Sequence, residues 1–232
     1  MGDDFEGEFQ VIVMGEFGPF ETKADERWTS SWTKALDEIN SPAIDTAVEK
    51  APEILKKADL AKLSPDERLM LGQALLLGGH LDDAQQVLVG AAKEAGKDNP
   101  SLAQWIWCSA AWAAWLGHDE AKLKQATDQV FAVVEADRAK RDDWNMRHWC
   151  AAWLLGSVTA DEFVTGCTQP PWDAGALFFV AERPFRDGNL DEAKAAYKRC
   201  LKQCEERGGY LFLGWAEWRL KQLEAKRPEK VQ

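Results

Sequence analysis

The chain has 232 residues, of which 46% are hydrophobic and 29% charged, a composition typical of a folded protein with a sizeable core. Its formal net charge is −11, and it contains 12 Trp but only 2 Tyr. Nucleic-acid binding depends on clustered Lys and Arg that neutralise phosphates, so this acidity predicts that nucleic acid is not a partner.

The first 22 residues form an acidic, aromatic segment that differs from the rest of the chain. Six carboxylates precede Lys23, and residues 9–13 are predicted to be a short extended run. Two interpretations stay open: a cap over the apolar side of the first helices, or an arm that reaches a second molecule and permits self-association. The start lacks the features of a signal peptide, and the apolar run 102–117 is short for a bilayer. We therefore expect a soluble, cytoplasmic protein without membrane insertion.

Residues 23–226 repeat one pattern, and residues 227–232 are predicted to be a tail. Apolar residues recur at helical spacing, a short break follows, and an acidic helix start comes next. The breaks fall near residues 40, 79, 117, 156 and 188, at spacings of 39, 38, 39 and 32 residues. Gly in a break can end a helix in the left-handed conformation, and the polar residues after it can cap the next helix. The pattern predicts an all-α domain of paired helices.

Helix-start signals of a second kind separate one pair from the next. They combine Pro with Ser, Asp or Asn at residues 63–67, 97–101 and 168–173, and they carry Asp at 140–143 and Gly at 207–209.

Two stretches, residues 65–95 and 174–223, resemble tetratricopeptide repeats. The matching residues are Leu71, Gly72, Leu75, Ala84, Leu88 and Ala91 in the first stretch, and Ala193, Tyr197, Cys200, Tyr210, Leu213 and Gly214 in the second. Pro184 departs from the family pattern, because an aromatic residue is expected there. The resemblance implies a right-handed solenoid of antiparallel helix pairs, about five pairs plus a C-terminal helix. It also implies a protein-binding scaffold or adaptor and not an enzyme.

The tryptophans concentrate on the first helix of each pair, which in such solenoids lines a concave groove. Aligning the breaks places nine residues in this groove: Leu69, Gln73, Leu76, Trp107, Trp115, Phe178, Phe185, Trp215 and Trp218. Trp105, Trp112 and Trp149 are expected to pack between helices. An acidic protein with an aromatic groove suits a peptide that carries apolar anchors and some basic residues. The alternative interpretation is that all the tryptophans fill the core.

Residues that could carry chemistry have simpler structural explanations. His80 and His118 are assigned to the turn position of Asn189, and His148 has no second ligand one turn away. Cys200 and Cys204 share one helix face, yet the five cysteines are expected to be reduced, unbridged and free of metal. We expect no cofactor. The alternative function is a helical enzyme or metal-dependent protein that uses carboxylates such as Asp82-Asp83, Asp119-Glu120 and Asp191-Glu192.

Overall fold

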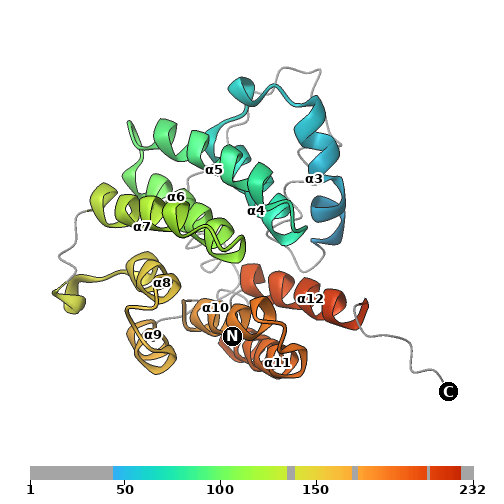
Figure 1. The fold of residues 1–232 in the computed structure, drawn as a ribbon, viewed down its shortest axis with the longest axis vertical. Coiled ribbons are helices and arrows are strands. Elements are labelled where there is room, and N and C mark those ends of the chain that lie inside the picture. Colours follow the sequence, from blue (N-terminus) through green and yellow to red (C-terminus); the bar gives the residue numbers. More distant parts are fainter. Residues whose placement is uncertain (1–43, 135–138, 169–171, 208–209, 226–232) are drawn as a thin grey trace, which may run out of the picture. The chain divides into compact units, whose positions relative to one another are not determined.

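The computed structural model describes residues 44–134, 139–168, 172–207 and 210–225 (Figure 1). The chain divides into two compact units, residues 1–33 and 34–232, and every described residue belongs to the second unit. The acidic segment 1–22, the extended run 9–13, the break near residue 40 and the tail 227–232 therefore lie outside the described residues.

The described residues are all-α, as the sequence predicts, and none of them belongs to a strand. The longer helices are α3 (Asp45–Lys57), α4 (Pro65–Leu77), α5 (Leu81–Ala95), α6 (Pro100–Leu116), α7 (Glu120–Val133), α8 (Met146–Leu154), α9 (Ala160–Gly166), α10 (Trp172–Arg186), α11 (Leu190–Arg207) and α12 (Tyr210–Ala225). Two 3₁₀ turns, η3 (Leu60–Lys62) and η4 (Arg141–Asp143), precede α4 and α8. Helices that follow one another in the chain pack side by side.

The turns within the pairs α4–α5, α6–α7, α8–α9 and α10–α11 share one backbone conformation. Each contains one left-handed residue: Gly79 (φ 84°), His118 (φ 55°), Gly156 (φ 72°) and Gly188 (φ 80°). The amide of this residue donates to the carbonyl three residues earlier, and the next amide donates to the carbonyl five residues earlier. This pair of bonds is the Schellman motif, which satisfies carbonyls that a helix end leaves unpaired. The predicted breaks at 79, 156 and 188 are confirmed, whereas the left-handed residue near 117 is His118.

Helix starts between the pairs follow their capping residues. Ser64 accepts from the Glu67 amide at 3.2 Å, and the Glu67 carboxylate accepts from the Ser64 amide at 2.7 Å, which completes a capping box before α4. The Asn99 side chain caps α6 by accepting from the Leu102 amide at 3.0 Å. The start predicted at 140–143 is wrong: those residues belong to η4 and its flank. The helix α8 begins only at Met146, because Asn145 supplies the capping oxygen.

Small residues allow close helix crossings at two places. A Cβ atom on Gly72 would lie 2.5 Å from Cγ of Leu88, so α4 and α5 approach closely at this glycine. A Cβ on Gly175 of α10 would lie 2.6 Å from Cζ of Phe212 on α12. Contacts this short leave no room for a side chain, which is why both crossings need glycine.

The last described helix packs against an early one. Besides its neighbours α10 and α11, α12 contacts α4, more than 130 residues earlier in the chain. Pro184 lies inside α10, and the helix continues through it to Arg186. The side chains of α4, α6, α10 and α12 that face one another form the centre of the core, and the candidate site lies there.

Candidate functional site

The nine residues predicted to line a groove lie on α4, α6, α10 and α12. They are Leu69, Gln73 and Leu76 on α4, Trp107 and Trp115 on α6, Phe178 and Phe185 on α10, and Trp215 and Trp218 on α12. Seven are buried, with exposed fractions of 6% or less, while Phe185 and Trp218 are half-buried. Buried side chains present little surface in this conformation, so partner binding by this set stays a prediction.

An aromatic cluster joins three of these helices. Trp112 of α6 and Trp215 of α12 stack with ring centroids 5.2 Å apart. Phe178 of α10 meets both rings edge-on, at 5.5 and 5.4 Å, and Phe179 and Phe212 complete the cluster. Edge-to-face and offset-stacked pairs are favoured by the ring quadrupoles. The sequence had separated Trp112 from the groove residues Phe178 and Trp215, but the structure brings the three together in the core.

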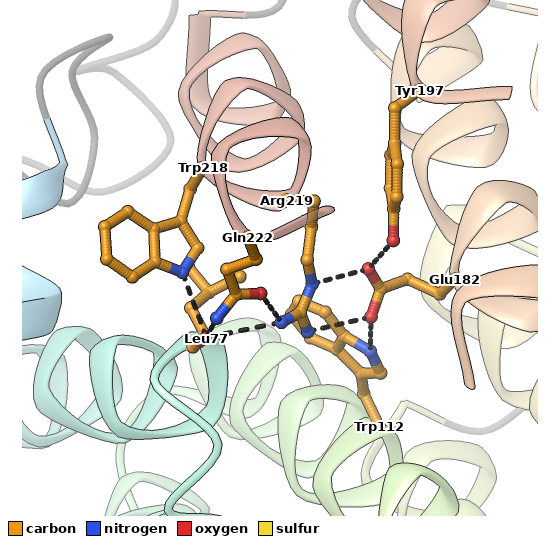
Figure 2. A network of polar contacts seen from close by, with 7 residues as sticks. All are labelled: Leu77, Trp112, Glu182, Tyr197, Trp218, Arg219 and Gln222. Atoms are coloured by element: carbon orange, nitrogen blue, oxygen red, sulfur yellow. Dashed lines mark hydrogen bonds and ion pairs between the residues drawn. The ribbon is translucent and has the colours of Figure 1, made fainter. Parts of the chain in front are cut away.

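A buried carboxylate organises a polar network beside this cluster (Figure 2). Glu182 of α10 is fully buried, and Arg219 of α12 donates from Nε to Oε1 at 2.8 Å and from Nη2 to Oε2 at 3.0 Å. Glu182 also accepts from the indole of Trp112 at 3.0 Å and from the hydroxyl of Tyr197. Four donors thus compensate for the loss of water around the carboxylate.

The titration of the network follows from its burial. Burial raises the pKa of Tyr197 well above its ordinary value, and the nearby charge of Glu182 acts in the same direction. Burial alone would lower the pKa of Arg219, yet the attraction of Glu182 outweighs it and raises that pKa. Arg219 and Tyr197 therefore stay protonated at neutral pH, and they hold the carboxylate in place.

The same face of α12 caps the C-terminus of α4. The carbonyl of Leu77 accepts from Trp218 Nε1 at 3.0 Å, Arg219 Nη1 at 3.2 Å and Gln222 Nε2 at 3.1 Å (Figure 2). A carbonyl at a helix end has no partner inside its own helix, and the positive guanidinium suits the negative end of the helix dipole. Trp218, predicted as a groove residue, thus has a polar contact within the fold.

Two arginines of α10 make related contacts with earlier helices. Arg186 lies 4.0 Å from the ring centroid of Trp115 and donates to its carbonyl at 3.3 Å. Arg183 lies 3.9 Å from the ring centroid of Trp153, and burial lowers the pKa of its guanidinium. Stacking of a guanidinium on an indole is favourable, so these arginines fasten α10 to α6 and α8.

Sequence reasoning did not identify the centre of this network. The available signal was an acid, Glu182, that directly follows the apolar stretch 174–181, and a basic residue, Arg219, between Trp218 and Leu220. Polar residues inside an apolar face predict a buried pair, because an unpaired charge there would be costly. Their separation by 37 residues conceals the pairing in the sequence.

The histidines occupy structural positions. His118 takes the left-handed turn position of Gly79, and His80 and Asn189 each follow the left-handed residue of their turn, which corrects the predicted equivalence of His80 and His118. His148 is buried, with Nδ1 accepting from the Asn145 amide at 3.2 Å and Nε2 lying 3.0 Å from the Val134 carbonyl. Burial lowers the pKa of His148 and favours the neutral ring.

All five cysteines are buried and unbridged in the structure. Burial raises the pKa of Cys150 well above its ordinary value, with a smaller effect from Cys108, and raises that of Cys167 to about 12. The thiols of Cys150 and Cys167 therefore stay protonated at neutral pH. Across the described ranges, no three His, Cys, Asp or Glu side chains are grouped so as to hold a metal ion.

The paired carboxylates lie at helix starts. Asp119 accepts from the Lys122 amide at 3.0 Å, and that bond lowers the pKa of the Asp119 carboxyl. Asp82-Asp83 and Asp191-Glu192 occupy the first turns of α5 and α11. Negative charge in the first turn is favourable to the helix dipole, so these positions have a structural explanation.

A surface cavity of about 400 Å³ lies between α9, α10 and α11, away from the predicted groove. Val164 of α9 and Leu177 and Val180 of α10 supply apolar walls, while Asp161 and Arg199 contribute opposite charges. None of its lining residues belongs to the set predicted from the sequence to bind a partner.

Comparison with known proteins finds no counterpart: the chain matches no protein-family model, no curated protein and no solved structure. Among the described residues, no helix combines the length and hydrophobicity that crossing a membrane requires.

Proposed function

We propose that the chain is a helical-repeat scaffold that binds another protein or a peptide. The proposed architecture is a right-handed solenoid of antiparallel helix pairs, similar to tetratricopeptide repeats. The observation that supports it is the repeated hairpin turn, with left-handed residues at 79, 118, 156 and 188 and one hydrogen-bond pattern. Stacked repeats contact mainly their neighbours and leave long surfaces available for partners. We place this activity in the cytoplasm, in keeping with five unbridged thiols.

The proposed partner carries apolar anchor residues and some basic residues. The net charge of −11 attracts basic segments and repels acidic ones. The aromatic residues near the surface offer the large, stiff contacts from which interface hot spots are made. Among the nine predicted groove residues, Phe185 and Trp218 are the two with appreciable exposure, so they are the members to test first.

The test is capture of partners from an extract of the native cells, followed by titration of the purified partner in a calorimeter. We expect one or more proteins that bind the wild-type chain at a fixed stoichiometry. We also expect that Phe185→Ala/Trp218→Ala weakens this binding. Trp144→Ala serves as the matched control, since Trp144 is also a half-buried aromatic residue but lies outside the predicted groove.

Folding is controlled separately. Circular dichroism and thermal melting must show that each variant keeps its helices, because Trp218 also bonds to the carbonyl of Leu77. The scaffold proposal is contradicted if no captured protein binds again when purified. Full binding by the folded double variant would instead reject the predicted groove while keeping the scaffold.

A further inference from the structure

The pair α8–α9 is about half as long as the pairs beside it. The helices α8 and α9 have 9 and 7 residues, whereas α6 and α7 have 17 and 14, and α10 and α11 have 15 and 18. Thr159 caps the start of α9. The helix ends at Gly166, which lies so close to Trp149 that a Cβ atom on this glycine would be 2.3 Å from the indole ring. Within the described residues this short pair contacts α10, and helices of 9 and 7 residues can cover only part of it.

The cavity between α9, α10 and α11 lies alongside α9, which contributes half of its lining residues. Leu177 and Val180, about one turn apart on α10, are half-buried, as is Val164 on α9. Residues one turn apart lie on one face of a helix, so these apolar groups form a continuous wall. Its volume of about 400 Å³ is within the range of ligand-binding cavities.

Two opposite charges at the cavity have no partner within the described part of the chain. Asp161 of α9 and Arg199 of α11 both line the cavity and are exposed. Neither forms an ion pair or a side-chain hydrogen bond with a described residue, although other charged residues of these helices do, for example Glu162 with Arg141. An apolar wall between an unpaired acid and an unpaired base is complementary to a segment with the reverse arrangement.

We propose that this cavity is the docking groove for an amphipathic α-helix of the partner protein. Aliphatic side chains at i and i+3 or i+4 would pack on Val164, Leu177 and Val180, with an acidic residue near Arg199 and a basic residue near Asp161. A helix is the fitting occupant because α9 and α11 bound the groove, and an amphipathic helix can lay its apolar face on the wall while its polar flanks meet the two charges. The inference rests on the proposed scaffold function, and it assigns the partner class and the place where the partner binds.

The test uses a displayed library of helical peptides of about 14 residues, selected against the full chain. Enriched peptides should share an aliphatic stripe, with an acidic residue on one side and a basic residue on the other. By fluorescence anisotropy, Arg199→Glu should weaken the binding of an enriched peptide roughly three- to tenfold, since an attractive exposed pair becomes repulsive. The peptide with its acidic residue changed to Lys should regain that affinity on the Arg199→Glu variant.

Lys198→Glu is the matched control. Lys198 is exposed, adjacent to Arg199 on α11 and outside the cavity lining, and its substitution changes the net charge by the same amount. It should leave the peptide affinity within about twofold of wild type, because an exposed charge pointing elsewhere is screened by salt. Leu177→Gln should weaken binding roughly tenfold through the apolar wall, with thermal melting to confirm folding.

Position is checked by an added thiol. Because the five native cysteines are buried, Thr165→Cys supplies an accessible thiol at the cavity. A peptide whose terminal cysteine is activated as a mixed disulfide should exchange with this thiol and release the activating thiol. Equal loss of affinity in Arg199→Glu and Lys198→Glu, or no enriched peptide, would overturn the proposal. If two copies of the chain associate and Leu177→Gln abolishes that association, the occupant of the groove is a second copy of this chain and not a partner's helix. The scaffold proposal is judged apart from this, by whether a captured native protein binds the wild-type chain again; if that protein also binds Arg199→Glu at full strength, the scaffold stands and only the groove is rejected.

Discussion

At the scale of single residues, the conformation of the four hairpin turns depends on one left-handed position in each. Three of these positions are Gly, for which a positive φ is inexpensive, and the fourth is His118 at φ 55°. A residue with a Cβ atom is strained there by about 1 kcal/mol, because the Cβ approaches the backbone carbonyl. Backbone strain at His118 therefore lowers the stability of the fold at this turn.

Replacing this histidine should stabilise the protein. Removing the backbone strain by His118→Gly should raise the free energy of unfolding by about 1 kcal/mol. Part of this gain is offset because Gly gives the unfolded chain more conformational entropy. The measurement is urea unfolding followed by circular dichroism. Gly79→Ala is the inverse control: no atom lies within 4 Å of its added Cβ, so a loss of about 1 kcal/mol would arise from the backbone alone. Destabilisation by His118→Gly would contradict this account.

A second residue-scale prediction concerns His148 and pH. Burial holds the folded-state pKa of His148 below its ordinary value of 6.5, so the unfolded chain takes up this proton more readily. The neutral ring therefore contributes stability that is fully present above pH 6.5 and is lost as the pH falls below it. Protonation would also set an N–H group against the Asn145 amide, which now donates to Nδ1.

The expected loss from this single site is at most about 1.4 kcal/mol per pH unit. Comparing urea unfolding at pH 7.5 and 5.0, His148→Gln should show a smaller drop than wild type. The exposed His80 provides the control, and His80→Gln should keep the wild-type pH dependence. An equal drop in wild type and His148→Gln would rule out His148 as the source.

At the scale of elements, the crossing of α4 and α5 depends on Gly72. We expect Gly72→Ala to lower the free energy of unfolding by about 1–3 kcal/mol, because the new methyl group overlaps the Leu88 side chain. By contrast, Gly90→Ala in the middle of α5 should raise the free energy of unfolding by about 0.5–1 kcal/mol, because the added Cβ meets no atom within 4 Å. Adding Leu88→Ala to Gly72→Ala should cost less than the sum of the single changes, which a thermal or urea double-mutant cycle measures. Strict additivity would exclude the contact.

The helices were predictable because their boundaries are set locally. Ser64 with Pro65, and Asn99 with Pro100, carry the side-chain acceptor and the fixed φ that begin α4 and α6. The start of α8 was wrong because several polar residues compete there, and only geometry shows that the Asn145 side chain accepts the first amides. Local chemistry thus determines that a helix begins in a given segment, but it determines the first residue of that helix less strictly.

The candidate site was less predictable because a sequence does not show what covers an apolar face. The spacing of Trp107 and Trp115 is compatible with an open groove and with a filled core alike. Both are buried, and the Trp115 ring is covered by Arg186 of α10, which follows much later in the chain. The cavity beside α9 likewise joins residues of three helices, and repeat spacing alone does not reveal which of them meet.

At the scale of the whole described unit, the network of Glu182 and Arg219 connects distant parts of the chain. Arg219 of α12 bonds simultaneously to Glu182 of α10 and to the last residue of α4, Leu77. Lys221, half a turn along α12, pairs with Asp45 of α3. A residue with contacts to both early and late helices couples their unfolding, whereas helices that contact only neighbours can unfold separately.

The network therefore predicts joint loss of stability in α4 and α12. Arg219→Leu leaves the Glu182 carboxylate buried without its counter-charge, which should cost about 3–5 kcal/mol in urea unfolding. Amide hydrogen exchange should accelerate at the α4 end, around residues 78–80, as well as in α12. The double variant Glu182→Leu/Arg219→Leu should cost less than the sum of the two single variants, because it buries no unpaired charge. Lys198→Leu, on an exposed position, should change stability by less than about 0.5 kcal/mol. Faster exchange confined to α12 would show that the two helices unfold independently, and that Arg219 stabilises its own helix without coupling it to α4.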